Sequence, residues 1–511
     1  MILLILAVNK TYSIPINTYR GFRSNLHLYR FTLTFFCGLL LTVLAAAIWQ
    51  GEEPCRIRTY TLAMGVFLTA TAIILLAARW KLIGSASFWL LLFALKLVLN
   101  VASTYYLWFE PLAPDLLRVM EGESFVKLQD SNLYDYYALK AAENGILQSW
   151  DFLNFTWLSF GITSYLAIIY SLLGVSVAYV SMCNALLSLV GLIMLCATLR
   201  LLFEAQRKWD WVALSAFIPS IAYYDATPAK EPLTQALYLS GLYAITALLW
   251  KRQIQFNRIM LVLLMLGLLA LVRVNVVFML LIACSYPVLH RVGIWKSLAV
   301  GIAVTIMVVF VYITLYDSPQ VLSSVFELEG RITSVASLVE ERGAEGATGL
   351  KQVVSEAFAP RSASHLLLWS PLRPVIWFYL PYPLLIPSFN GLTNVPSLFL
   401  EARMAKVFVP HELAFTFSGY LLILATPYLI GACLSFFRGN FFNLSLLLFN
   451  IFIPALLIGN LQFIMGRRYR ILIEPIVLAT VLVAIHYRLG RKLIWPVWLL
   501  MFGGVILVAL L

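Results

Sequence analysis

Long apolar runs dominate this chain, and their length limits what the chain can fold into. Runs such as 180–203 and 232–250 carry at most one charged residue, and about twenty apolar residues are what an α-helix needs to cross a bilayer. A backbone in lipid must satisfy its own hydrogen bonds, so such runs predict spanning helices. Of all residues, 62% are hydrophobic and 12% charged, against roughly 45–50% and 25% in soluble domains. We therefore predict an all-α, polytopic integral membrane protein.

About thirteen runs qualify as spanning helices, and short basic clusters separate many of them. The predicted spans are 31–50, 60–79, 86–108, 180–203, 209–224, 232–250, 257–272, 274–290, 296–315, 411–435, 441–459, 469–487 and 493–511. A further apolar run, 156–175, is interrupted by Ser159, Gly161, Thr163 and Ser164.

The basic residues orient the bundle, because Lys and Arg concentrate in cytoplasmic loops. With the N-terminus in the cytoplasm, the basic loops after 60–79, 180–203 and 232–250 also fall inside, provided that 156–175 does not cross. We therefore predict that 156–175 is a juxtamembrane or re-entrant helix.

Three polar segments then share the exported face: 109–155, the turn 223–231 and the long loop 316–410. This organisation predicts three parts. They are an N-terminal transmembrane module (1–315), an exported loop or subdomain (316–410) and C-terminal transmembrane helices (411–511).

The segment "QDSNLYDYYALKAAENG", residues 129–145, is polar and aromatic in otherwise apolar surroundings. Asp130 and Tyr134 stand four residues apart, so a helix starting at Asp130 stacks them on one face. Asp130 could simply cap that helix, and the tyrosines could pack in the interface or stack on a substrate. The role of Asp135 is open.

A second polar feature, "AYYDATPAKEPLTQALYL", places Lys230 and Glu231 at the start of a returning helix. A lysine beside a helix N-terminus is a ready phosphate site. The alternative is that the Lys-Glu pair only anchors the helix at the membrane boundary.

The third feature, "MGRRYRILIEPIVLA", groups Arg468 and Arg470 on the side predicted to be exported, against the positive-inside trend. Such arginines need an anionic partner, either a lipid phosphate or an acidic residue such as Glu474. Two further charges, Arg273 and Lys96, lie inside apolar runs, where a charge is costly unless it faces a cavity or a partner. Arg273 is predicted near the exported surface, within reach of the arginine cluster, while no partner could be assigned to Lys96.

Several classes of function find no support. The net charge is +12, and the basic residues lie in short clusters between the apolar runs. This distribution is typical of residues that orient spanning helices and does not indicate nucleic-acid binding. The five histidines and six cysteines show no metal-ligand spacing. Phosphate-loop and nucleophile-elbow motifs are absent from the sequence. No cofactor is predicted, and nothing indicates a divalent metal.

In order, the motifs resemble those of the GT-C glycosyltransferases, typified by protein O-mannosyltransferases and the lipid A aminoarabinose transferase. The similarity rests on the Asp130 loop, "YSLLGVSVAYVSMCNALL", "LRLLFEAQRK", the "KEPL" turn and "RYRILIEP", and covers roughly 125–290 and 465–490. Here "NFTWLSFGITSY" replaces the family's His-Pro-Pro type element. Family members transfer a sugar from a polyprenyl-phosphate carrier on the exported face, and a carboxylate of the first exported loop is the usual general base.

The resemblance implies that Asp130 is the catalytic base and that Lys230, Glu231, Arg468 and Arg470 surround the carrier phosphate or the acceptor. Tyr134, Asp135 and Arg273 are further candidates for substrate binding. The implied partners are a polyprenyl-phosphate carrier, membrane lipids and a glycan, lipid or protein acceptor, with no nucleic acid. The implied location is a bacterial inner (plasma) membrane with the active site facing the periplasm.

Two other functions compete with this one. A lipid-linked polysaccharide polymerase or ligase would rely on arginines of loop 316–410, namely Arg331, Arg342, Arg361 or Arg373. A lipid or glycan transporter or flippase would be expected to show internal repeats, and none is evident in the sequence.

Overall fold

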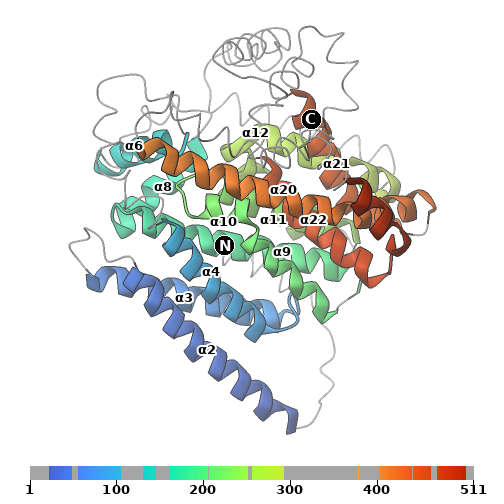
Figure 1. Ribbon diagram of the computed structural model, residues 1–511. Coiled ribbons are helices and arrows are strands. Elements are labelled where there is room, and N and C mark those ends of the chain that lie inside the picture. Colours follow the sequence, from blue (N-terminus) through green and yellow to red (C-terminus); the bar gives the residue numbers. More distant parts are fainter. Residues whose placement is uncertain are drawn as a thin grey trace.

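A computed structural model describes residues 22–48, 56–104, 130–144, 160–204, 206–250, 256–292, 374, 378, 402–439, 441–461 and 469–501. In these ranges the chain forms helices and short turns, without a β-strand (Figure 1). The predicted all-α class is confirmed for this part of the chain.

Seven helices in the described ranges are long and apolar enough to cross a membrane, or up to eight if a pair bent by 107° at residues 486–491 counts as one span. The chain is therefore an integral membrane protein with several spanning helices, but the predicted thirteen spans are not confirmed. Of the thirteen, 296–315 lies outside the described residues.

Residues 22–292 include six long helices and two shorter ones. These are α2 (Phe22–Ile48), α3 (Arg56–Arg79), α4 (Ala86–Thr104), α6 (Asp130–Asn144), α8 (Phe160–Leu173), α9 (Val177–Leu202), α11 (Glu231–Trp250) and α12 (Phe256–Val292). The second half adds α20 (Ala402–Phe437), α21 (Leu444–Leu461), α22 (Arg470–His486) and the short 3₁₀ turn η8 (Arg491–Leu493). Helix α20 begins inside the predicted loop 316–410, and the rest of that loop, apart from 374 and 378, lies outside the described residues.

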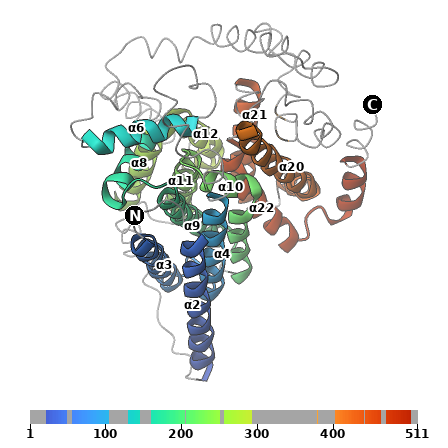
Figure 2. The ribbon, with the colours of Figure 1, turned by 60° about the vertical axis from the view of Figure 1, so that its left-hand side comes forward.

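Helices α9 and α11 occupy the middle of the bundle, with α2 and α3 on one side and α20 and α22 on the other (Figures 1 and 2). Their packing is close because Gly191 of α9 faces Ala236 of α11. A Cβ at Gly191 would lie 3.0 Å from the Ala236 Cα. Small residues that let two backbones approach in this way are typical of helix contacts in membranes.

Helix α8 is too short to cross a bilayer alone, since its 14 residues rise about 21 Å. It ends at Leu173 and is followed by Gly174, whose positive φ of 96° is a conformation that glycine adopts without steric cost. Helix α9 begins three residues after Gly174. The prediction that 156–175 is not a full span agrees with this length.

The predicted spanning helix 209–224 is wrong as a continuous α-helix. The structure has a 3₁₀ helix, η4 (Arg207–Phe217), and a short α-helix, α10 (Pro219–Asp225), separated by the extended residue Ile218 (φ −60°, ψ 127°). Asp210, Ser215 and Ser220 are buried in it, and Asp210 and Ser220 bond to other elements, which favours a broken backbone over a regular helix. The segment nevertheless runs back along α9.

Helix α12 is two arms joined at Arg273, whose extended backbone (φ −158°, ψ 96°) interrupts the helical conformation. Arg273 pairs with Glu231, at the first residue of α11. His290, near the end of the second arm, and Trp250, at the end of α11, both contact Phe442, with 4.4 and 6.3 Å between ring centroids. The second arm therefore runs from the Glu231 end of α11 to its Trp250 end. The break at Arg273 lies between the predicted spans 257–272 and 274–290, but Phe256–His290 counts as one candidate span.

These contacts define two ends of the bundle. At the Lys208 end, the Gly84 amide donates to Asp210 Oδ1 at 2.7 Å, Lys208 contacts His486, and Asn443 donates to Leu202 O at 2.6 Å. At the opposite end, the Lys230 end, lie the starts of α11 and α22 and the apex of α12.

Candidate functional site

Lys230 lies immediately before α11 and directs its ammonium over the ring of Tyr134, with Nζ 5.1 Å from the ring centroid. Tyr134 is 4% exposed and packs into the interface between α6 and α8. A cation over an aromatic face is an attractive contact. It holds the lysine beside α6, which begins at Asp130 as the sequence predicted.

Glu231 and Arg273 form a buried ion pair next to Lys230. The distance from Arg273 Nη2 to Glu231 Oε1 is 2.7 Å, and the guanidinium carbon lies 4.4 Å from the ring centroid of Tyr469. The Tyr469 hydroxyl accepts a hydrogen bond from Asn275 Nδ2 at 2.8 Å. The apex of α12, the start of α11 and the start of α22 are therefore joined through two charges and one aromatic ring.

Arg470 follows Tyr469 and is fully buried, with Nη2 3.5 Å from Glu474 Oε1. This is the acidic partner that the sequence offered as the alternative to a lipid phosphate. Glu474 also accepts a hydrogen bond from Ser220, and the Ser418 hydroxyl donates to the Ser220 hydroxyl at 2.9 Å. The ion pair thereby links α22 to α10 and α20.

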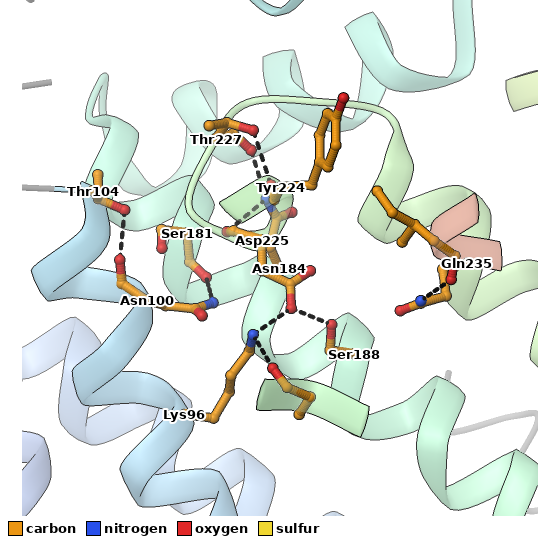
Figure 3. A network of polar contacts seen from close by, with 12 residues as sticks. Lys96, Asn100, Thr104, Ser181, Asn184, Ser188, Tyr224, Asp225, Thr227 and Gln235 are labelled. Atoms are coloured by element: carbon orange, nitrogen blue, oxygen red, sulfur yellow. Dashed lines mark hydrogen bonds and ion pairs between the residues drawn. The ribbon is translucent and has the colours of Figure 1, made fainter. Parts of the chain in front are cut away.

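A second buried ion pair lies deeper in the bundle, between Lys96 of α4 and Asp225 of α10 (Figure 3). Nζ and Oδ2 are 2.8 Å apart, and the two side chains are 2% and 1% exposed. Lys96 also donates to Ala216 O at 2.7 Å, and the Ser188 hydroxyl donates to Asp225 Oδ2 at 2.6 Å. Asp225 is thus the partner of Lys96 that could not be assigned from the sequence.

Of the predicted site residues, five come together at the Lys230 end: Tyr134, Lys230, Glu231, Arg273 and Arg470. Arg273 reaches the start of α22, as expected for a residue within reach of the arginine cluster. For Asp130 and Asp135 the structure describes the backbone in α6 but not the side chains. Arg468 lies outside the described residues, as do Arg331, Arg342, Arg361 and Arg373.

Sequence reasoning missed Tyr469 and the Lys96–Asp225 pair. The charge inside α4 signalled that a partner must exist, but its partner is 129 positions away along the chain. Tyr469 stood between two singled-out arginines, and its position in that cluster was the available signal.

The Lys230 end combines cations, a carboxylate and aromatic rings at the boundary of an apolar bundle. Arginine and lysine bind phosphate oxygens by charge-assisted hydrogen bonds. Within the described ranges, no group of three or more His, Cys, Asp or Glu side chains could hold a metal ion.

Comparisons with known proteins found no matching family model, no similar curated protein and no similar solved structure.

Proposed function

We propose that this protein is a membrane glycosyltransferase of the GT-C type. It transfers a sugar from a polyprenyl-phosphate carrier to an acceptor hydroxyl on the exported face of a bacterial inner membrane. Asp130 is the general base, and Lys230 and its neighbours bind the carrier phosphate.

One observation carries the proposal: Lys230 is held against Tyr134, one helical turn after Asp130. The same residue adjoins the Glu231–Arg273 pair. An acidic residue and a set of cations therefore lie close to one another at one end of an apolar bundle. A transferase that deprotonates an acceptor hydroxyl beside a departing lipid phosphate can use this combination.

The reaction is a single displacement. The acceptor oxygen attacks the anomeric carbon, the bond from that carbon to the phosphate oxygen breaks, and the carrier phosphate leaves with the electron pair. Asp130 takes the proton of the acceptor hydroxyl as the new bond forms. The cations stabilise the charge that develops on the departing phosphate, and a single displacement inverts the anomeric centre.

The distribution of basic residues favours an exported Lys230 end. Lys81 and Arg488 lie in turns at the opposite end, where Lys208 lies at the start of η4, and basic residues at the ends of spanning helices are typical of the cytoplasmic side.

The test uses the full chain in lipid nanodiscs with undecaprenyl phosphate linked to radiolabelled sugars, and measures release of undecaprenyl phosphate in the presence of membrane extract as acceptor. We expect Asp130→Asn to lower the rate by about 10²–10⁴-fold, the usual contribution of a general base. The matched control is Asp115→Asn, which lies in the same predicted exported segment, 109–155, and should retain the wild-type rate.

Three results would count against this function. Near-normal activity of Asp130→Asn would reject the general base. If activity were lost instead in Arg361→Gln, the polymerase or ligase reading would replace the transferase. Retention of configuration in the product would exclude the single displacement.

A further inference from the structure

The segment 225–231 connects α10 to α11, and a buried ion pair holds it at each end. Figure 3 shows the first of these pairs, Lys96–Asp225. Asp225 pairs with Lys96 of α4, and Glu231 pairs with Arg273 at the apex of α12. Lys230 stands next to the second pair. The position of Lys230, which is proposed to bind the carrier phosphate, therefore depends on this short connection. Regular secondary structure does not stabilise the connection along its length.

Side chains from two neighbouring helices bind the backbone carbonyls of this connection. Asn184 of α9 donates from Nδ2 to Asp225 O at 3.2 Å and to Thr227 O at 2.9 Å. The hydroxyl of Thr104, the last residue of α4, lies 3.0 Å from Ala226 O and 2.8 Å from Asn100 O, so its one proton is shared between these two carbonyls. Three consecutive carbonyls are thus bound by side chains that belong to other elements, which fixes the path of the chain.

The amides of the same residues are bonded locally. The Ala226 amide donates to Ala222 O at 3.3 Å and the Thr227 amide to Tyr224 O at 3.0 Å. At the other end, Lys230 O accepts from the Thr234 amide at 2.9 Å and so belongs to the first turn of α11. Loosening the carbonyl contacts would free the Ala226 and Thr227 amides to exchange with solvent.

A buried ion pair is often no more stabilising than well-packed apolar side chains of the same size. Lys96 does more than neutralise Asp225, because it also binds Ala216 O and so ties the end of η4 to the end of α10. Its contacts fix where two short segments end and where the 225–231 connection begins.

We propose that Lys96, Thr104 and Asn184 form an internal anchor that positions the 225–231 connection. Through this connection the anchor also positions Lys230 and Glu231. These three are positioning residues, because their contacts reach the site only through the connection. The inference rests on the proposed function only for the identity of the ligand, the carrier phosphate, that Lys230 and Glu231 are proposed to bind.

The test compares hydrogen exchange at the Ala226 and Thr227 amides in Thr104→Val and Thr198→Val, using the full chain in nanodiscs. Both threonines are fully buried and bond a carbonyl four residues earlier in their own helix, but only Thr104 also binds Ala226 O. We expect exchange at these amides to rise about fivefold in Thr104→Val, the effect of one lost hydrogen bond. Thr198→Val should leave it unchanged, and Thr104→Ser, which keeps the hydroxyl, should restore the wild-type value.

A general loss of stability gives a different pattern, with exchange rising throughout α4 and α9. That pattern, or equal exchange in Thr104→Val and Thr198→Val, overturns the anchor. Lys96→Met should raise exchange at 226–227 more than Thr104→Val does, because it leaves the Asp225 carboxylate buried without its cation.

Repeating the measurement with undecaprenyl phosphate in the nanodiscs separates the anchor from the proposed function. Protection of the Lys230 and Glu231 amides in the wild-type protein supports the carrier site. If the carrier does not protect the Lys230 and Glu231 amides while Thr104→Val still raises exchange at 226–227, the anchor is supported and the carrier site is rejected. If the carrier protects but Thr104→Val behaves like Thr198→Val, the anchor falls and the carrier site stands.

Discussion

At the scale of single residues, six buried charged side chains of the described bundle are paired with an opposite charge. Three ion pairs carry this pattern: Lys96–Asp225, Arg273–Glu231 and Arg470–Glu474. The third is an i,i+4 pair, so the sequence could propose it from helix geometry. The first two join distant parts of the chain, and no local pattern identifies such partners.

The Arg273–Glu231 pair predicts a mutant cycle. Arg273→Met leaves Glu231 buried without its cation, and removing one partner of a buried pair costs about 3–5 kcal/mol. We expect a clearly lower midpoint of thermal unfolding in detergent, or lower yield, for Arg273→Met. The double variant Arg273→Met/Glu231→Met should recover much of that loss.

The control for this cycle is Arg438→Met, because Arg438 is exposed at the Lys208 end and its removal should change the midpoint little. A double variant that is less stable than Arg273→Met would contradict the pairing.

At the scale of elements, the apolar runs predicted helix position well because lipid leaves the backbone no alternative to a helix. The run 180–203 became α9 and 232–250 became α11, each shifted by a few residues at most. The prediction of a continuous helix over 209–224 was wrong because buried polar side chains of this segment bind other elements. Hydropathy does not register such tertiary contacts. The two-arm structure of α12 followed from two adjacent apolar runs.

The contact between α8 and the apex of α12 gives a prediction about Gly161. A Cβ at this position would lie 2.6 Å from Leu271 O and 2.8 Å from Val272 Cγ2, so Gly161→Ala must push α8 away from the residues that precede Arg273. We expect a lower unfolding midpoint and weaker carrier binding. Gly267→Ala on the same α12 has nothing within 4 Å of the added Cβ and should be neutral or slightly stabilising, since alanine favours a helix by about 1 kcal/mol over glycine. Equal effects of both variants would contradict the close contact.

At the scale of the whole molecule, the basic connections gather at the Lys208 end and the candidate site at the Lys230 end. The sequence predicted this separation from the spacing of Lys and Arg, but it could not show which helices meet at each end. Arg468, the side chain of Asp130 and most of the loop 316–410 lie outside the described residues, so their predicted roles remain predictions.

Sidedness can be measured with single cysteines in a background that lacks the six native ones. Glu143 is exposed on α6, and Arg438 is exposed at the Lys208 end. On intact cells, a membrane-impermeant maleimide should label Glu143→Cys and leave Arg438→Cys unlabelled until the membrane is permeabilised. The reverse result would show the opposite orientation in the membrane, with the candidate site facing the cytoplasm.

The central claim is that the Lys230 end binds the phosphate of a lipid carrier, and the affinity of the protein in nanodiscs for undecaprenyl phosphate tests it most directly. Lys230→Gln removes a cation from this end, while Lys208→Gln removes one from the opposite end. We predict saturable binding that Lys230→Gln weakens by about tenfold or more, as expected for a lost charge-assisted hydrogen bond, and that Lys208→Gln leaves within about twofold of wild type. Equal affinities for the wild-type protein and both variants would contradict the claim.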